Sequence, residues 1–336
     1  MPYEKIDLRN LKVLPLKERE NKMFAAEILP LDFKSDFQSK ELDALIAAIV
    51  EARLNNKEVI WFMGAHVLRQ GAAWMIIDLM RRDLITHIAA NGAVAIHDFE
   101  MAYQGATLED VERYIVDGKF GNWDETGKFV NEAAKRSFHC GRGFGEALGM
   151  LIAESDFPFK HMSIFAKAYK SLVPATIHKG IGFDITDQHP SADFAAIGKA
   201  SGDDFLIFAK GIFQLEGGVF VNLGSAVTGP EVYLKALSIA RNLAKQEGRE
   251  IKHFTTAVID LAPLGDWQSN PSVVDWKKPG AMDDPRYYYR PLKSILVRTV
   301  KDGGKSHFIQ GKFIDVIPAL YAGLLAATKK PGVSGV

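Results

Sequence analysis

Short apolar runs recur along the chain, and each is followed by a turn of small or polar residues. They cover residues 59–63, 85–90, 173–178, 219–223 and 254–260. Several segments between them carry apolar residues at helical spacing, as at Leu42, Leu45 and Ile49. Buried strands that alternate with helices indicate a parallel sheet with right-handed crossovers. We therefore predict a doubly wound α/β fold with a mostly parallel sheet and helices on both faces, in a single large domain.

The remaining pattern predicts helices, one hairpin and an N-terminal arm. Helical spacing is found over residues 39–54, 67–81, 98–121, 131–154, 157–172, 205–215 and 313–326. Glycines at 141–145 interrupt one of these helices, and a turn between two helices explains them better than a phosphate loop, since no strand precedes them. Residues 294–300 and 306–310 flank an Asp-Gly-Gly turn, which predicts a hairpin. Residues 1–34 show no sustained period and are predicted to form an arm, followed by one domain over residues 35–330.

The fourth apolar run leads into a turn that suits ligand contact. Gly224, Ser225 and Ala226 follow it, and Pro230 and Glu231 then open an apolar-periodic segment. Proline is pre-set for a first helical turn, and unpaired N–H groups at a helix N-terminus favour phosphate or carboxylate groups. The stretch is therefore either a ligand-binding corner or an ordinary strand-to-helix turn of an open sheet.

An acidic loop follows the third apolar run. It contains Asp184, Asp187, His189 and Asp193, at the edge where open α/β sheets bind ligands. Carboxylates that are desolvated in a cleft pair strongly with ammonium groups, which favours a polyamine. The same residue types could hold a metal ion, and Asp side chains also cap loops. The pattern leaves these three interpretations open.

Lys293 follows three tyrosines, Arg290 and a proline. A lysine beside a cation and aromatic rings can have a lowered pKa and form a Schiff base with an electrophilic carbon. The alternative is an ordinary solvated lysine, which is what most basic residues are. The residues around it leave both interpretations open.

Charge and cysteine content restrict the classes of partner and compartment. The chain carries 41 Lys plus Arg and 41 Asp plus Glu, so no net field attracts nucleic acid or an acidic membrane surface. Cys140 is the single cysteine, which excludes an intrachain disulfide and a multi-cysteine metal site. The N-terminus lacks an apolar signal core, and residues 313–327 are too short, and too interrupted by Asp315 and Pro318, to cross a membrane. We predict a cytoplasmic protein without a metal that binds neither nucleic acid nor membranes.

Taken together, these motifs resemble the deoxyhypusine synthase family, and more closely its bacterial deoxyhypusine synthase-like branch. The resemblance runs over about residues 40–326 and is carried by Gly64-Ala65-His66, Asn91-Gly92-Ala93-Val94, residues 180–184, residues 223–227, the predicted strand end Thr255-Thr256-Ala257, and Lys293. It implies a Rossmann-like, NAD-binding domain that assembles as a homotetramer with NAD at subunit interfaces. It also implies hydride abstraction from spermidine, loss of 1,3-diaminopropane, capture of the aminobutyl imine on a lysine, transfer to an acceptor amine, and return of the hydride.

The resemblance assigns roles by position. The cofactor-binding segments contain Gly64, Ala65, His66, Asn91, Gly92, Gly224, Ser225, Ala226, Thr256 and Ala257. Asp184, with Asp187 beside it, falls on a substrate carboxylate, and Lys293 falls on the imine-forming lysine. The family's proton-transfer histidine has no counterpart at its usual place, so His189 or Glu231 is the candidate for that role.

The sequence therefore predicts an NAD-dependent transferase that moves an aminobutyl group from a polyamine such as spermidine through an enzyme-lysine imine. A small amine acceptor, as in homospermidine synthase, is favoured over a protein lysine. The alternatives are another NAD-dependent enzyme that acts on an amine, and a catalytically silent binding protein of the same fold. The arm and a long aromatic excursion at residues 265–289 are expected to cover a partner subunit in a homo-oligomer.

Overall fold

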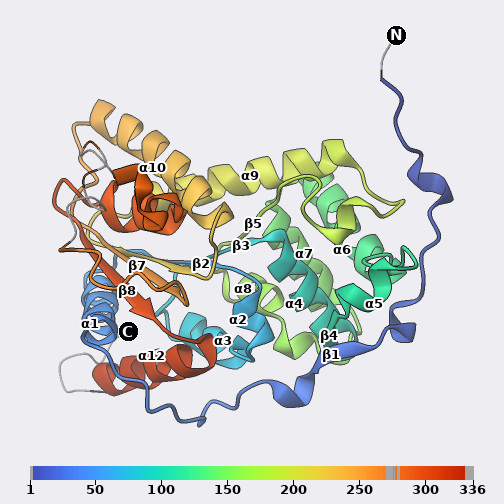
Figure 1. The fold of residues 1–336 in the computed structure, drawn as a ribbon, viewed down its shortest axis with the longest axis horizontal. Coiled ribbons are helices and arrows are strands. Elements are labelled where there is room, and N and C mark those ends of the chain that lie inside the picture. Colours follow the sequence, from blue (N-terminus) through green and yellow to red (C-terminus); the bar gives the residue numbers. More distant parts are fainter. Residues whose placement is uncertain (1–2, 270–274, 276, 278–280, 330–336) are drawn as a thin grey trace. The chain divides into compact units, whose positions relative to one another are not determined.

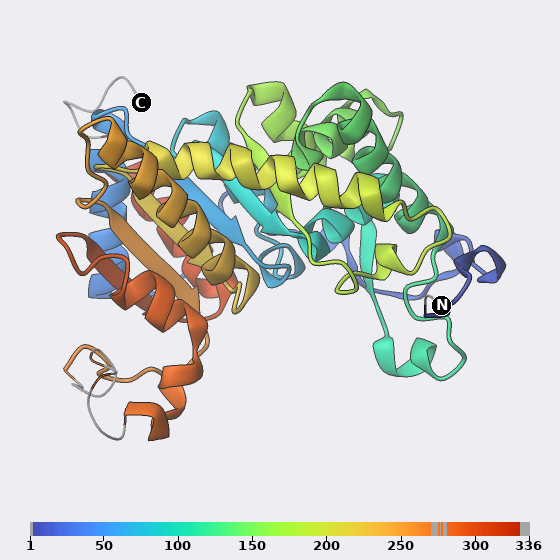
Figure 2. The same ribbon diagram turned by 90° about the horizontal axis from the view of Figure 1, so that it is seen from above.

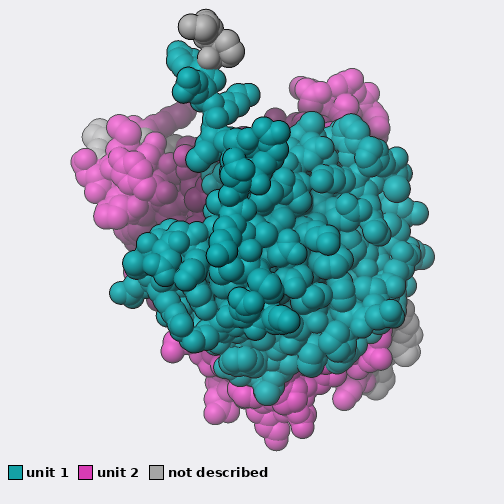
Figure 3. Space-filling view, turned by 90° about the vertical axis from the view of Figure 1, so that its right-hand side faces the viewer, with its two compact units in different colours: residues 1–27, 92–204 teal, residues 28–91, 205–336 magenta. Residues whose placement is uncertain are grey.

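The computed structural model describes residues 3–269, 275, 277 and 281–329 of the chain. The chain folds into two compact units. Unit 1 contains Met1–Glu27 and Gly92–Asp204, and unit 2 contains Ile28–Asn91 and Phe205–Val336; they are coloured separately in Figure 3. The division predicted from the sequence, an arm over residues 1–34 and a domain over residues 35–330, stays a prediction.

Unit 2 is built on a parallel sheet. Its neighbouring strands run in the order β3 (His87–Asn91), β2 (Val59–Met63), β6 (Val219–Leu223), β7 (Thr255–Asp260) and β8 (Lys305–Gln310). β2 and β6 are buried along their whole length, which explains why β2 is a continuous apolar run in the sequence and β6 is apolar except at Asn222. Met63 pairs with Leu223, and Leu223 with Ile259, so the carboxyl ends of β2, β6 and β7 lie at one edge of the sheet.

Helices cover both faces of this sheet (Figure 1; Figure 2). One face carries α1 (Lys40–Leu54), α3 (Ala73–Arg81) and α12 (Phe313–Thr328), and the other carries α10 (Thr228–Gln246), the π-helix η8 (Leu292–Val297) and the last residues of α9 (Phe194–Phe213). Under α10, the rings of Phe220 and Tyr233 stack with their centroids 4.1 Å apart in a core of fully buried side chains. The predicted fold class, a Rossmann-like, doubly wound α/β fold with a mostly parallel sheet, is confirmed.

Unit 1 is mainly helical and includes the first part of the N-terminal arm. Its helices are α4 (Gly92–Gln104), α5 (Val111–Ile115), α6 (Asp124–Cys140), α7 (Phe144–Glu154) and α8 (Ile164–Ser171), and its strands are β1 (Asn21–Phe24), β4 (Ala106–Glu109) and β5 (Ala175–His178). Gly141 has a φ of 65° directly after α6, which confirms the turn predicted between two helices. β1 and β4 form an antiparallel pair, so residues of the arm belong to the fold of this unit.

Short helical turns complete the two units. They are η1 (Leu8–Asn10), η2 (Leu16–Glu18), η3 (Ala25–Glu27), η4 (Lys160–Met162) and η5 (Ile185–Asp187) in unit 1, and α2 (His66–Arg69), η6 (Ala281–Asp283) and η7 (Pro285–Tyr288) in unit 2. Residues 270–274, 276 and 278–280 of the excursion predicted at residues 265–289 lie outside the described residues. Within the described ranges, no helix has the length and apolarity that crossing a membrane requires.

The prediction of a single helix over residues 98–121 is wrong. α4 begins at Gly92 and ends at Gln104, because Gly105 turns the backbone into the left-handed region with a φ of 68°. The next residues form β4 and α5. β4 depends on pairing with β1, a contact between distant parts of the chain that the local pattern does not encode.

Two further helices begin at other residues than predicted, because side-chain caps fix their first turns. α8 starts after Ser163, whose hydroxyl accepts the N–H of Ala166 at 2.9 Å. α9 extends back to Phe194, after Asp193, whose carboxylate accepts the N–H groups of Ala195 and Ala196 at 3.0 Å each.

The hairpin predicted near the C-terminus is also wrong. Residues 292–297 form the π-helix η8, and β8 pairs in parallel with β7, with Thr255 opposite Lys305. The Thr256 hydroxyl donates to Ile295 O at 3.1 Å and so connects η8 to the sheet. The apolar residues between 294 and 300 suggested a strand, but in the structure η8 packs against β7 and β8 and does not pair with the edge strand β8.

Candidate functional site

Two glycine turns lie at the carboxyl edge of the unit 2 sheet. The Gly64 N–H donates to Leu223 O at 2.8 Å, and the Gly224 N–H donates to Ile259 O at 3.1 Å. A Cβ on Gly64 would lie 2.5 Å from Gly224 O, and a Cβ on Gly224, whose φ is 62°, would lie 2.6 Å from the Phe313 ring. Gly64 is therefore required by the close approach of the Gly224 backbone, and Gly224 by its positive φ and the Phe313 ring, whether or not a ligand binds there.

The first turn of α10 follows directly. The Ser225 hydroxyl accepts the Gly229 N–H at 2.7 Å, and the Asn222 side chain donates to Ser225 O at 3.1 Å. Hydrogen bonds of buried polar groups therefore stabilise this turn. Ala226 and Val227 lie on the surface, the latter with 56% of its area exposed. α10 is 19 residues long, and its N-terminus, the positive end of the helix dipole, lies at this exposed turn. Phosphate binding at this turn stays a prediction.

Ala65, His66, Asn91 and Gly92 are the other predicted cofactor residues at chain turns. Ala65 and His66 begin α2, and Asn91 ends β3. Partial burial, and then the charge of Arg69, lower the pKa of His66, so the ring is neutral at pH 7. Gly92 opens α4 and belongs to unit 1.

Thr256 and Ala257 do not lie at a strand end, which corrects the sequence-based placement. β7 continues to Asp260, and both residues are fully buried in its first half. The Thr256 hydroxyl is used by the backbone of η8, as described above. We therefore leave both residues out of the site proposed below; Asp260, which accepts the Tyr289 hydroxyl at 2.7 Å, occupies the strand end instead.

Lys293 lies in η8 with 9% of its surface exposed. Its Nζ is 3.8 Å from the centroid of the Tyr287 ring, a contact that favours the ammonium form. Burial, followed by the charges of Arg298 and Arg290, lowers the pKa of Lys293, and the charge of Glu231 opposes this shift. Single-turn π-helices are frequent at functional sites, and here the element places a lysine amine in a poorly solvated position.

Glu231 connects this lysine to the first turn of α10. It accepts a hydrogen bond from Arg290 at 2.7 Å and forms an ion pair with Lys235. The hydrogen bond from Lys235, followed by the charges of Lys235 and Arg290, lowers the pKa of Glu231. Its negative charge also acts on Lys293, so Glu231, Arg290 and Lys293 lie close together in unit 2.

Asp184, Asp187 and Gly92 come together in unit 1. The Asp184 carboxylate covers the start of α4, since a Cβ on Gly92 would lie 1.9 Å from Asp184 Oδ2. Asp187 is fully engaged: it pairs with Lys179 and accepts the Gly182 N–H at 2.8 Å. Lys179 Nζ lies 4.0 Å from Asp184 Oδ2, which is beyond hydrogen-bond distance. Asp187 thus fixes the loop, and Asp184 and Asp187 form the capping box of η5. A substrate contact of Asp184 stays a prediction.

His189 and Asp193 are part of the scaffold around this loop. Asp193 caps α9, so for this residue the structure supports capping among the three interpretations of the acidic loop. The His189 ring fills the space that a Cβ on Gly127 would occupy, and its Nδ1 is 2.7 Å from Ser191 Oγ. Burial lowers the pKa of His189. In the part of the chain that the structure describes, no three His, Cys, Asp or Glu side chains are grouped to hold a metal ion.

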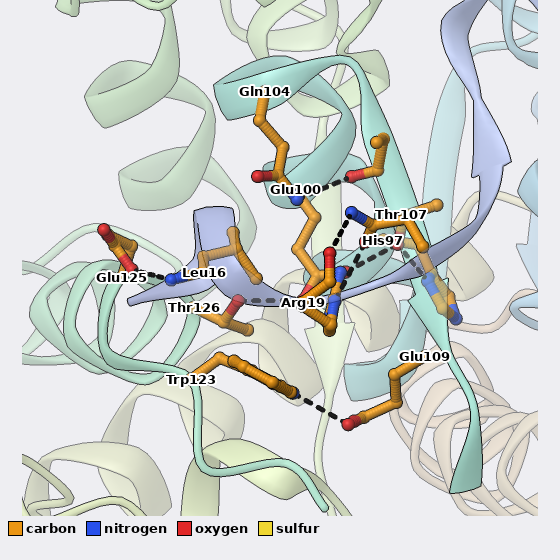
Figure 4. A network of polar contacts seen from close by, with 12 residues as sticks. Leu16, Arg19, His97, Glu100, Gln104, Thr107, Glu109, Trp123, Glu125 and Thr126 are labelled. Carbon is orange, nitrogen blue, oxygen red and sulfur yellow. Dashed lines mark hydrogen bonds and ion pairs between the residues drawn. The ribbon is translucent and has the colours of Figure 1, made fainter. Parts of the chain in front are cut away.

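Sequence reasoning missed Lys179 and Arg19. Lys179 directly precedes the acidic loop, and an isolated lysine beside three aspartates was an available signal for an internal ion pair. Arg19 lies in the arm, where no period marked it. Its side chain is 1% exposed and forms a 2.6 Å ion pair with Glu100 (Figure 4).

Comparisons with known proteins show similarity at the level of the fold. No protein-family model and no curated protein sequence matches the chain. An arginine dihydrolase of the ornithine–ammonia cycle in cyanobacteria, in its apo form, superposes with a TM-score of 0.50 at 13% identity, over 86% of this chain and 33% of that one. The chain thus spans about a third of the length of that protein.

Two further structures are less similar. An LOR/SDH protein from Methanococcus maripaludis S2 gives a TM-score of 0.47 at 13% identity, over 88% of this chain and 72% of that one. A protein from Entamoeba histolytica described as a deoxyhypusine synthase gives 0.45 at 10% identity, over 87% and 90%. At these identities, likeness concerns the fold alone.

Proposed function

We propose that this chain is an NAD-dependent aminobutyl transferase that acts on a polyamine through an imine on Lys293. The observation that carries the proposal is the environment of Lys293: buried in η8, with a lowered pKa, in the neighbourhood of the first turn of α10. Such a lysine keeps a larger share of neutral amine near pH 7 than a solvated one. The neutral amine is the form that attacks an imine carbon.

The reaction balances in four steps. NAD would supply the hydride acceptor for oxidation of the polyamine at the butyl-side carbon next to its secondary nitrogen, and the hydride donor for the last step. Between them, the Lys293 amine adds to the C=N bond and 1,3-diaminopropane leaves with the proton. The acceptor amine then displaces Lys293 in the same way. Glu231, whose charge acts on Lys293, is proposed as the group that transfers protons in these steps.

The chain's residues fit a dinucleotide at the turn after β6. Gly224-Ser225-Ala226 leads into a long helix whose first turn is open, and Gly64 packs against it. We expect Ala226→Asp to weaken NAD binding by about tenfold or more, because the new carboxylate repels the pyrophosphate at the helix N-terminus. Titration calorimetry measures the affinity, with Ala226→Ser as the small, neutral control. Equal affinity of the Asp variant and the unmodified protein would remove this site.

The function is tested by incubating the protein with spermidine and NAD and measuring 1,3-diaminopropane by mass spectrometry. We expect release of the diamine, and none from Lys293→Ala. Binding of NAD without release would favour another NAD-dependent enzyme acting on an amine. Absence of both would leave a binding protein of the same fold.

A further inference from the structure

The last turns of α10 line a pocket at the amino edge of the unit 2 sheet. Its walls come from α10, from the segment that leads into β7, and from the turn before β8. They consist of Arg241, Lys245, Arg249, Glu250, Ile251, Lys252 and Asp302, and the pocket volume is about 230 Å³. A cavity of roughly 150 Å³ holds a benzene molecule, so this pocket has room for a phosphate group with a small substituent.

The pocket lies at the opposite end of α10 from the turn after β6. α10 contains 19 residues, which correspond to about 28 Å at a rise of 1.5 Å per residue. Lys245 is in the last turn of the helix, whereas Gly224 and Ala226 precede its first turn. A ligand in this pocket would therefore be separate from the NAD site proposed above.

Arg241 is held in place, but its charge is not paired. Its Nε donates to Ile251 O at 2.9 Å, and its Nη2 donates to Thr299 O at 2.8 Å. Its guanidinium carbon lies 5.9 Å from the centroid of the Phe254 ring. All these partners are neutral, and within the described ranges no carboxylate forms an ion pair with this guanidinium. A half-buried arginine that is already ordered can bind an anion with little further loss of side-chain freedom.

Two lysines lie close to Arg241. Lys245 is one helical turn further along α10 on the same face, and among the described residues it has no carboxylate partner. Lys252 forms an ion pair with Glu250 at 2.7 Å. That hydrogen bond, and then the charge of Asp302, raises the pKa of Lys252, while the charge of Arg241 opposes the rise. The pocket thus brings three cations together around one unpaired carboxylate, that of Asp302.

Positive charge continues onto the rim of the pocket at Phe213. The guanidinium carbon of Arg249 lies 4.4 Å from the centroid of this ring, and Lys210 Nζ lies 5.0 Å from it. Arg249 pairs with Glu247 at 2.7 Å. Lys210 is exposed and forms no ion pair with any carboxylate that the structure describes.

The ion pairs leave an excess of positive charge here. Two of the five cations are balanced by the glutamates with which they pair. The other three are Arg241, Lys245 and Lys210, and Asp302 is the remaining carboxylate of the pocket. Two positive charges therefore remain, in a chain whose formal net charge is zero. The negative end of the α10 dipole amounts to about half an elementary charge and offsets only part of this excess.

We propose that this pocket is a second ligand site, which binds the phosphate group of a small molecule between Arg241, Lys245 and Lys252. A phosphate carries up to two negative charges, which matches the local excess, and its oxygens suit the planar donors of a guanidinium. The inference goes beyond the proposed function and does not depend on it, since the site contains neither Lys293 nor the turn after β6.

The direct test is titration calorimetry of the full chain with inorganic phosphate at pH 7.5 and low salt, without NAD. We expect a dissociation constant of about 1 mM or tighter, and at least about tenfold weaker binding of acetate, which carries a single charge. Added sodium chloride should weaken phosphate binding, because the pocket is open to solvent. Ala226→Asp should bind phosphate as the unmodified protein does, since its change lies at the other end of α10.

Charge variants identify the residues that bind phosphate. Lys245→Gln should weaken phosphate binding by about fivefold or more, and Lys40→Gln, at an exposed lysine of α1, is the matched control that should leave it unchanged. Asp302→Asn should tighten binding, because it removes the opposing charge of the pocket. Arg241→Gln should lose binding, with circular dichroism as the check of its fold; Lys245 has no described side-chain partner to lose, so its variant keeps the test valid.

Four outcomes would overturn the proposal. They are no phosphate binding at several millimolar, equal affinity for phosphate and acetate, equal affinity in Lys245→Gln and the unmodified protein, and loss of phosphate binding in Ala226→Asp. The last outcome would place the phosphate at the first turn of α10 instead. Tighter binding by Asp302→Asn together with weaker binding by Lys245→Gln supports the pocket, because a purely structural role of these side chains would not produce opposite shifts.

Discussion

Replacing Arg19 by methionine is expected to lower the free energy of unfolding by about 3–5 kcal/mol, because it leaves Glu100 as a buried carboxylate without its cation. Both side chains of this pair are 1% exposed, and Arg19 also stacks over Trp123, with 5.7 Å between the guanidinium carbon and the ring centroid. The loss should appear as an earlier urea transition monitored by tryptophan fluorescence.

The matched control is Arg113→Met. Arg113 also pairs with a glutamate of the arm, Glu20, but the two side chains are 54% and 69% exposed, so water screens the pair and its loss should cost at most about 1 kcal/mol. Adding Glu100→Gln to Arg19→Met should recover part of the stability, because the stranded charge is then removed. If Arg19→Met is no more destabilising than Arg113→Met, the arm is not anchored by this pair.

The strands of unit 2 could be predicted because a strand that is buried on both faces consists of mostly apolar consecutive residues. β2 and β6 are covered on both faces, so β2 is a continuous apolar run in the sequence and β6 is apolar except at Asn222. The turns after them were also recognisable, since Gly64 and Gly224 lie where two backbones come within contact distance. In these places local composition and tertiary environment agree.

The elements that sequence reasoning missed depend on contacts between distant residues. β4 exists through its pairing with β1, and η8 is held by the Thr256 hydroxyl, so neither is determined by its own period. The same holds for the candidate site. The acidic loop was evident, but only the fold distinguishes Asp187, which is paired with Lys179, from Asp184, which lines a cavity. A spacing of three residues contains no information about which carboxylate pairs with the lysine.

Lys293→Ala is expected to abolish formation of the covalent adduct while NAD binding stays unchanged. The test is borohydride reduction during incubation with spermidine and NAD, followed by mass spectrometry of peptides, which should place an aminobutyl group on this residue. Lys293→Arg should be equally inactive, because a guanidinium stays protonated. Lys301→Ala, at an exposed lysine of the following turn, is the control that should keep full trapping.

The pH profile of trapping separates a catalytic amine from a structural one. Burial, then the charges of Arg298 and Arg290, lower the pKa of Lys293, and the attacking species is the neutral amine. Trapping should therefore rise with pH and level off below the usual range of lysine. Arg290→Gln removes one of the charges that oppose protonation, so the profile should shift to higher pH. Glu231→Gln removes the opposing negative charge and should shift it to lower pH. A profile that neither variant moves, or an adduct on Lys301 or Lys305, would show that the imine-forming lysine is a different residue.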